Sequence, residues 1–414
     1  MPFCSLGLSE PLARAVSDFT EPTPVQAEAI PVVLEGGDVL ATAKTGSGKT
    51  TAFVLPLLQR WVSAPRKKGQ DVHTLILVPT RELAAQVRDV VQQCSRHLTE
   101  RIKIVSAVGG VSVNPQMLAL RGGADFIVAT PGRLLDLVDK NAVKLSEVQS
   151  LVLDEADRML DLGFADELGR ILQLLPEQRQ NLLFSATFPE GVESLAKEIL
   201  HEATWIEVDT DPDDAPDIKQ RAILVDKAER GPLLRHLIRE EGWKRVLVFV
   251  ASQRSADNVA DKLQNNGINA HSFHGDLSQG ARKRALFELR DSKIQVLVAT
   301  DLASRGLDII QLPVVLNYDL PRSTEDYTHR IGRTGRAGKS GIAVSFVTAE
   351  AQAHLCLIEK RQKLTIPREK IPGFEPTDVP PISAETPKGT GGIKGKRKSK
   401  KDKLREAAAR TKKE

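Results

Sequence analysis

Two stretches of this chain carry residue types that handle phosphate groups and metal ions. The first, Ala43-Lys-Thr-Gly-Ser-Gly-Lys-Thr50, is a glycine-rich turn that ends in a lysine and a threonine. The second, Asp154-Glu-Ala-Asp157, directly follows the apolar run Leu151-Val-Leu153. A buried strand that ends in acids delivers them to the carboxyl edge of a sheet, where open α/β folds bind ligands. An acidic tetrapeptide alone is also typical of a surface loop, so the first stretch has to decide between the two interpretations.

The first stretch fits the phosphate-loop pattern G-x-x-x-x-G-K-[ST] in part, because Ala43 stands where the first glycine is expected. An expected strand at 38–43 precedes it and an expected helix at 51–61 follows it, which is the context that the loop requires. Backbone N–H groups in the turn can surround phosphates, and a helix N-terminus favours anions. Lys49 would reach the β- and γ-phosphates, and the Thr50 hydroxyl would bind Mg²⁺. A merely flexible turn would not explain why Gly-Lys-Thr opens a helix.

Because a phosphate loop lies upstream, the stretch Asp154–Asp157 can be interpreted as part of the same nucleotide site. Asp154 would hold Mg²⁺ largely through water, and Glu155 would orient or deprotonate the attacking water. The chemistry predicted is nucleotide hydrolysis. Asp157 is the acid least expected to touch the nucleotide, and we expect it to pair with His329 or with the turn between Ser185 and Thr187.

Short apolar runs alternate with helical stretches on both sides of one acidic segment. The runs are rich in Val, Ile and Leu, as parallel strands covered on both faces are, so the alternation predicts doubly wound α/β domains. The segment 209–217 holds five acids and two prolines and is expected to be a linker. The expected strands are 38–43, 74–79, 104–108, 126–130, 151–153 and 182–185 before it, and 221–225, 245–250, 270–274, 295–299, 314–317 and 343–347 after it.

Charge and cysteine usage set further bounds. Residues 388–414 carry twelve Lys/Arg and three Asp/Glu, a net +9, whereas the whole chain is +4, so the remainder is about −5. A tail of this charge can bind the phosphates of a nucleic acid, with a solubilising terminus or a nuclear-type signal as the alternatives. No apolar run approaches a membrane span, and no secretory signal is visible. The three scattered cysteines indicate a reducing compartment, hence a cytoplasmic protein, or a nuclear one only if the source is eukaryotic. Cys94 falls on an apolar stripe and is expected to pack.

The motifs together resemble the DEAD-box ATP-dependent RNA helicases. To the two stretches above the chain adds Pro79-Thr-Arg-Glu-Leu83, Thr130-Pro-Gly-Arg133 and Ser185-Ala-Thr187, then His274-Gly-Asp-Leu-Ser-Gln279, Ala299-Thr-Asp-Leu-Ala-Ser-Arg-Gly-Leu-Asp-Ile309 and His329-Arg-Ile-Gly-Arg-Thr-Gly-Arg336. The resemblance covers roughly residues 1–365, and the compact core with its short basic tail looks like the bacterial RhlE-type group. It implies two tandem RecA-like parallel-sheet domains at 1–208 and 218–366, the linker at 209–217, and a mostly disordered basic tail at 367–414.

The resemblance also implies roles for individual residues. Phe19 and Gln26 match an adenine-recognising motif, in which the Gln26 amide suits the N6/N7 edge of the base. Arg333 and Arg336 match arginine fingers that act with Lys49 and Glu155 in catalysis. The residues expected to hold ATP and Mg²⁺ are Phe19, Gln26, Ala43, Lys44, Thr45, Gly46, Ser47, Gly48, Lys49, Thr50, Asp154, Gly306 and Asp308.

A second group implied by the resemblance holds RNA. Backbone amides, hydroxyls and arginines suit phosphate and ribose contacts and carry little base information, so the grip is expected to be independent of sequence. Asp157, Ser185, Thr187 and His329 would couple this surface to the hydrolysis site. The residues expected on RNA are Arg81, Gly110, Thr130 and Arg133 in the first domain and Arg254, Gly275, Gln279, Arg282 and Thr300 in the second.

Closure of two domains around ATP and RNA is the mechanism that these positions imply. Family members open short RNA duplexes locally, and we expect the same here, with remodelling of ribonucleoprotein as the outcome. The alternatives are an RNA clamp or chaperone that uses ATP as a lock with slow turnover, and a DNA-directed translocase of the same superfamily. The core is expected to be monomeric, with ribosomal or RNA-decay proteins as further partners and no membrane contact.

Overall fold

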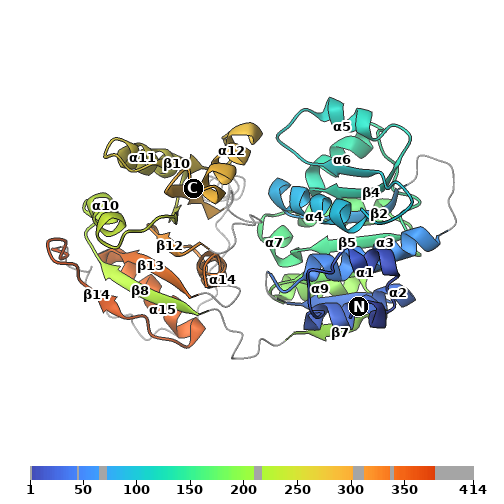
Figure 1. Cartoon of the computed structure of the whole chain (residues 1–414), viewed down its shortest axis with the longest axis horizontal. Coiled ribbons are helices and arrows are strands. Elements are labelled where there is room, and N and C mark those ends of the chain that lie inside the picture. Colours follow the sequence, from blue (N-terminus) through green and yellow to red (C-terminus); the bar gives the residue numbers. More distant parts are fainter. Residues whose placement is uncertain are drawn as a thin grey trace, which may run out of the picture.

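The computed structural model describes residues 2–43, 46–64, 72–208, 217–301, 312–335 and 340–377. Within these ranges the chain forms two α/β domains that stand side by side, the N-terminal one in blue to green and the C-terminal one in green to red (Figure 1). Lys44, Thr45, Gly306, Asp308 and Arg336, most of the expected linker and the expected tail beyond Thr377 lie outside the described residues.

The first domain is built on a seven-stranded sheet in which every pairing is parallel. Its strand order is β3-β4-β2-β5-β6-β1-β7. All residues of the central strands β5 and β6 are buried, since helices cover both faces; the middle of each strand is apolar and the polar residues lie at the ends. The strands are β1 Val39–Thr42, β2 Val72–Leu77, β3 Ile104–Ala107, β4 Ala124–Ala129, β5 Ser150–Asp154, β6 Gln180–Ser185 and β7 Thr204–Glu207.

Two hydrophobic clusters, one on each face, hold this sheet. One cluster packs α2, α3 and α4 against the sheet and contains the ring pair Phe53–Phe184, with centroids 5.2 Å apart. The other packs α6, α8 and α9. Cys94 is buried in the first cluster, as its place on the α4 stripe predicts. The helices are α1 Glu10–Arg14, α2 Pro24–Glu35, α3 Lys49–Ser63, α4 Arg81–Cys94, α5 Val113–Ala119, α6 Pro131–Asp139, α7 Ala156–Asp161, α8 Ala165–Leu174 and α9 Glu190–Ile199.

The second domain repeats this arrangement with a parallel sheet of order β10-β11-β9-β12-β13-β8-β14. Its strands are β8 Ile218–Leu224, β9 Val246–Val250, β10 Ala270–Phe273, β11 Val296–Thr300, β12 Val314–Asn317, β13 Gly341–Val347 and β14 Arg368–Glu369. The described helices are α10 Arg230–Glu240, α11 Gln253–Gln264, α12 Gln279–Arg290, α14 Thr324–Ile331 and α15 Gln352–Gln362. The two tandem parallel-sheet domains that the sequence predicted are therefore present.

Each of the twelve expected strands overlaps a strand of the structure, and the two edge strands β7 and β14 were not foreseen. In β7 only Ile206 is buried, so no apolar run marks it. β14 pairs with β8, and Arg221 binds Glu369 through two nitrogens at 2.7–3.0 Å. The second sheet thus includes residues 368–369, whereas the last strand expected from the sequence was 343–347. None of the helices in the described ranges is long and apolar enough to cross a membrane.

Candidate active site

The phosphate loop connects β1 to α3 at the edge of the first sheet. Gly46 and Gly48 have φ of 91° and 89°, a left-handed backbone that favours glycine. A Cβ on Gly48 would collide with the Gln26 amide. Lys49 is the first residue of α3; it is buried and donates from Nζ to the Ala43 carbonyl oxygen at 2.6 Å. The turn is therefore a tight cradle at a helix N-terminus, closed by its own lysine.

Gln26 joins the loop to the preceding helix. Its Oε1 accepts a hydrogen bond from the Thr23 backbone N–H at 3.0 Å, which forms a capping box at the start of α2. Its Nε2 donates to Thr51 Oγ1 at 2.7 Å and to the Gly48 carbonyl at 3.3 Å. The sequence assigned this amide to adenine. Both Nε2 hydrogens are engaged within the protein, so donation to a base requires an exchange of one of these partners, whereas Oε1 can accept a second hydrogen bond. Phe19 is 54% exposed.

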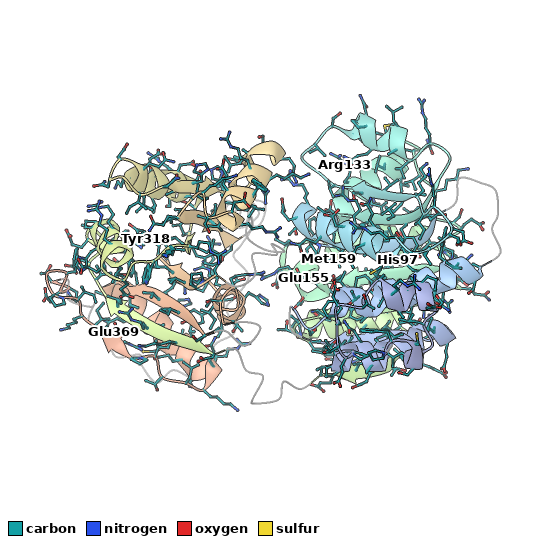
Figure 2. All side chains as sticks on the ribbon, in the orientation of Figure 1. His97, Arg133, Glu155, Met159, Tyr318 and Glu369 are labelled. Atoms are coloured by element: carbon teal, nitrogen blue, oxygen red, sulfur yellow. The ribbon has the colours of Figure 1, made fainter. Side chains whose placement is uncertain are left out.

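The acidic strand end lies at the carboxyl end of β5. Asp154 is the last residue of the strand and is 3% exposed. Burial raises its pKa to about 7, and the nearby Lys49 ammonium opposes that rise. Glu155 follows with φ 55°, a left-handed backbone that is unusual for a residue with a side chain. Such strain gathers at functional sites. Figure 2 shows Glu155 on the side of the first domain nearest the second.

Asp154 also provides a test of whether a metal ion suits this site. Its Oδ1 is buried and has no hydrogen-bond partner within the described ranges. A carboxylate oxygen left without a donor is costly unless a cation or a donor supplies its missing partner. Thr50 lies half-buried in the first turn of α3 and offers a hydroxyl oxygen. This oxygen-only donor set fits Mg²⁺, which commonly keeps several waters.

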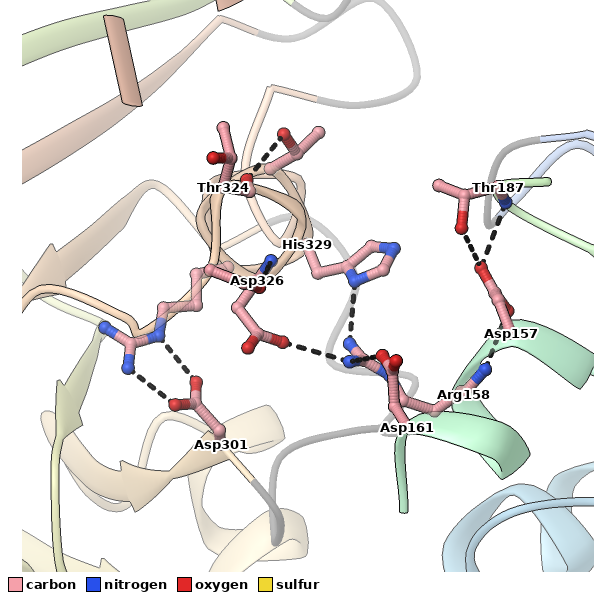
Figure 3. Close-up of polar contacts among 11 residues, drawn as sticks. Asp157, Arg158, Asp161, Thr187, Asp301, Thr324, Asp326 and His329 are labelled. Atoms are coloured by element: carbon pink, nitrogen blue, oxygen red, sulfur yellow. Dashed lines mark hydrogen bonds and ion pairs between the residues drawn. The ribbon is translucent and has the colours of Figure 1, made fainter. Parts of the chain in front are cut away.

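Asp157 binds the turn after β6. Its Oδ2 accepts from the Thr187 N–H at 3.0 Å and from Thr187 Oγ1 at 2.7 Å, and its backbone N–H donates to Ser185 Oγ at 3.3 Å. Of the two partners expected from the sequence, Asp157 therefore takes the Ser185–Thr187 turn (Figure 3). The acidic strand end and this turn are held as one unit.

His329 contacts the residue beside Asp157. Arg158 Nη2 lies 2.7 Å from His329 Nδ1, and Arg158 Nη1 lies 2.9 Å from Asp326 Oδ1 (Figure 3). Burial, followed by the Arg158 charge, lowers the pKa of His329 to about 4, so its ring is neutral at pH 7 and Nδ1 accepts the hydrogen bond from Arg158. A second contact crosses between the domains where Arg282 Nη2 meets Glu82 Oε1 at 2.9 Å.

Arg158 and Asp326 were not singled out from the sequence, and Glu82 was quoted only within Pro79-Thr-Arg-Glu-Leu83, without a role of its own. Arg158 and Asp326 lie 168 positions apart, so no local pattern pairs them. Arg282 was expected on RNA. Here it is 3% exposed and bound to Glu82, with its guanidinium 4.9 Å from the Phe273 ring centroid.

The arginine half of the site follows α14. The Arg333 backbone N–H donates to the Arg330 carbonyl at 3.2 Å. Arg330 is buried and anchors this helix: it pairs with both oxygens of Asp301 at 2.6 and 2.7 Å and donates to Asn317 Oδ1 at 3.0 Å. The segment that carries Arg333 is therefore fixed to the ends of β11 and β12.

The first-domain candidates for RNA share one corner around α4, α5 and α6. Gly110 has φ 70°, and a Cβ there would collide with the Arg81 guanidinium. Arg133 Nη2 donates to the Val111 carbonyl at 3.0 Å, which ties α6 to the same loop. Thr130 is the N-cap of α6 and is 8% exposed. The structure thus brings all four expected residues of this domain together.

The second-domain candidates lie at the carboxyl ends of β9, β10 and β11. Arg254 is exposed on α11, Gly275 follows β10, and Thr300 ends β11. Gln279 opens α12, and its Oε1 is buried with no hydrogen-bond partner in the described part of the chain. Apart from Arg282, which faces the first domain, these groups offer the mixture of N–H, hydroxyl and guanidinium that phosphates require.

A phosphate loop and two carboxylates on one α/β domain, opposite an arginine-bearing helix of a second, define the two-domain helicase class. Family models match residues 23–195 as DEAD/DEAH box helicase and residues 229–338 as helicase conserved C-terminal domain. The chain is 40% identical over 375 residues to DEAD-box ATP-dependent RNA helicase CshA of Bacillus cereus, covering 90% of this chain and 70% of that protein. This chain belongs to the DEAD-box helicase family.

Two further proteins show how much of a relative this chain spans and which fold it shares. Over 375 residues the chain is 40% identical to ATP-dependent RNA helicase DeaD of Escherichia coli, covering 90% of this chain but only 59% of that relative's length. The structure of S. cerevisiae Dbp5 bound to RNA and ADP BeF3 is similar, with a TM-score of 0.79 and 32% identity over 89% of this chain and 95% of that one. The two domains are therefore RecA-like.

Proposed function

We propose that this chain is an ATP-dependent RNA helicase, an RNA-stimulated ATPase that converts ATP and water to ADP and phosphate and opens short duplexes locally. The observation that carries the proposal is the division of the hydrolysis groups. Lys49, Asp154 and Glu155 belong to the first domain, and Arg333 belongs to the second. Hydrolysis therefore needs the domains to close. RNA bound across both domains favours the closed state, which couples RNA binding to the rate.

The residues of the first domain prepare the nucleotide. N–H groups of the loop and of the α3 N-terminus bind the phosphates, and Lys49 exchanges the Ala43 carbonyl for a phosphate oxygen. Mg²⁺, held by Thr50 and Asp154, supplies neutralisation of the phosphate charge when bound. Glu155 accepts the proton of the attacking water. From the second domain, Arg333 and Arg336 stabilise the charge on the transferring group.

The RNA grip is independent of base sequence in this proposal. The candidates at Gly110, Thr130 and Thr300, with exposed Arg254, can bind phosphate and ribose oxygens but offer little base readout. Contacts with 2′-hydroxyls distinguish RNA from DNA. Equal stimulation of the ATPase by single-stranded DNA and RNA would favour the DNA-directed translocase instead.

The direct test is Glu155→Gln, which keeps the side-chain volume but removes the base. RNA-stimulated ATP hydrolysis should fall by about 10²–10⁴-fold while ATP and RNA remain bound. Binding is measured with labelled RNA in the presence of ATP, and turnover by phosphate release. Undiminished hydrolysis would overturn the assignment of Glu155. Wild-type protein that locks onto RNA with ATP but scarcely turns over would be a clamp rather than a helicase.

The basic tail supports a further part of the proposal. Residues 388–414 carry +9 opposite a body of about −5, so the tail binds RNA electrostatically and delivers it to the core. A chain that ends at residue 387 should bind RNA more weakly at low salt, and the difference should shrink as salt is raised. Affinity that does not change with truncation would leave the tail with a solubilising role. Fluorescence anisotropy with a short RNA measures both.

The proposal extends to the subgroup, the partners and the location of the protein. The compact core and short basic tail support a place in the RhlE-type group. Sequence-independent contacts suit remodelling of ribonucleoprotein, with ribosomal or RNA-decay proteins as partners, a monomeric core and a cytoplasmic location. Capture of cross-linked RNA from cells tests this level of the proposal.

A further inference from the structure

A buried arginine that follows the Asp154–Asp157 stretch bridges the two domains. Arg158 is 6% exposed and belongs to α7, the short helix whose N-cap is Glu155. Its guanidinium reaches across to α14, where it meets Asp326 Oδ1 at 2.9 Å and His329 Nδ1 at 2.7 Å (Figure 3). The Arg158 and Asp326 side chains are 7% and 13% exposed. Water therefore screens this ion pair far less than it screens a surface pair.

Each end of this bridge is fixed to a different half of the candidate site. In the first domain, Asp157 of the same helix holds the Thr187 turn. In the second, Arg330 of α14 is bound to Asp301, and Arg333 follows one turn later. A contact between α7 and α14 consequently sets where Glu155 and Arg333 lie relative to each other.

The chemistry of the three groups is complementary only in one protonation state of the histidine. Neutral His329 presents a lone pair at Nδ1 to the arginine, whereas a protonated ring would repel it. The groups that face the ring are Arg158 and Asp157 from α7 and, from its own segment, Asp326 and Arg333. The Asp326 carboxylate supplies the negative charge, and Asp161 on α7 lies 3.4 Å from the same Arg158 nitrogen.

We propose that Arg158, through Asp326 and His329, is an interdomain latch that positions the two halves of the hydrolysis site. Arg158 is a positioning residue, since it acts through α7 and α14 and not on the nucleotide. The inference rests on the proposed ATPase for its kinetic consequence, whereas the contacts of the latch are made between protein groups alone.

A double-mutant cycle on Arg158→Met and Asp326→Asn tests the latch. Each single variant should lower kcat of the ATPase stimulated by single-stranded oligouridine by roughly 10- to 100-fold, because misplacement of catalytic groups by about 1 Å has effects of that size. The affinity for ADP should stay within about twofold, since the phosphate loop is untouched. The double variant should be no slower than the slower single, because both changes remove the same contact. Additive losses, or no loss, would overturn the proposal.

Controls separate positioning from folding. Lys197→Met with Glu193→Gln removes an exposed ion pair of 2.6 Å within α9 and should leave kcat unchanged. Asp326→Glu keeps the charge and should recover most of the activity that Asp326→Asn loses. This pair of variants carries the test even if Arg158→Met does not fold, and equal activity of the two would count against the latch.

The chain also carries its own labels for a measurement of domain separation. Cys4 and Cys356 are exposed and belong to different domains, whereas Cys94 is 3% exposed and burial raises its pKa to about 12. Dyes on Cys4 and Cys356 should therefore report energy transfer between the domains. Without ligands, Asp326→Asn should change the transfer efficiency and Glu193→Gln should not. An unchanged efficiency would sink the latch, and this result does not depend on whether the chain hydrolyses ATP.

Discussion

The two domains share one strand order but not one chemistry. Replacing each strand of the first sheet by the strand seven places later reproduces the order of the second sheet without exception. The first helix after the leading strand begins at Lys49 in one domain and at Arg230 in the other. Only the first domain places a glycine-rich turn before that helix. The fold alone therefore does not make a nucleotide site; the loop residues do.

The corresponding place in the second domain is closed by an ion pair. Arg230 Nη1 meets Asp319 Oδ1 at 2.6 Å, and the guanidinium lies 4.5 Å from the Tyr318 ring centroid. In the first domain, by contrast, Lys49 binds a backbone carbonyl and Asp154 keeps a buried oxygen without a partner in the described ranges. At this place the first domain leaves a buried carboxylate oxygen open to a cation or donor, whereas the second domain pairs its arginine with a carboxylate.

The largest difference between the two domains is expected for the substitutions Lys49→Ala and Arg230→Ala. Lys49→Ala should lower ATP hydrolysis by about 10²–10³-fold, as the loss of a charge-stabilising donor does. Arg230→Ala should leave nucleotide affinity unchanged and destabilise the second domain by about 1–3 kcal/mol, because Asp319 loses its arginine partner and keeps only the Ala251 N–H. Phosphate release and urea unfolding measure the two effects. A loss of ATP affinity in Arg230→Ala would contradict the conclusion that only the first domain forms the nucleotide site.

Gly110→Ala should have a smaller effect, confined to the first domain. The left-handed backbone at this position disfavours a side chain by about 1–2 kcal/mol, and the new Cβ would displace Arg81. RNA affinity should fall by about tenfold or less. Gly109→Ala is the matched control, since a Cβ there meets no atom within 4 Å. Equal affinities of the two variants in an anisotropy titration would show that Arg81 does not bind RNA from this position.

Local sequence patterns predicted the strands of the two sheets. They did not predict contacts between residues that are distant in sequence. Runs such as Leu151-Val-Leu153 mark β5 because both faces of the strand are buried. The edge strand β7 has one buried residue and no such run. The placement of Asp154 and Glu155 followed from the strand that ends at Asp154. Arg158 could not be foreseen, because its function depends on a helix that the second domain brings opposite it.

Gln26 and Arg282 show a second limit of motif matching. A motif indicates which residue contacts a ligand, but not which groups of the protein that residue also binds. Gln26 caps α2 and holds Thr51, and Arg282 holds Glu82 across the domains. Both residues would have to exchange a protein partner for nucleotide or RNA, which links ligand binding to a change in the protein.

Single-turnover hydrolysis by Arg333→Ala tests the divided site most directly. With ATP bound and RNA saturating, the wild-type chain should hydrolyse its nucleotide, and the variant should do so about 10³–10⁵-fold more slowly while binding ATP as tightly. Such a result would show that the second domain supplies a group which the complete first-domain half-site cannot replace. Hydrolysis at the wild-type rate in Arg333→Ala would contradict the account.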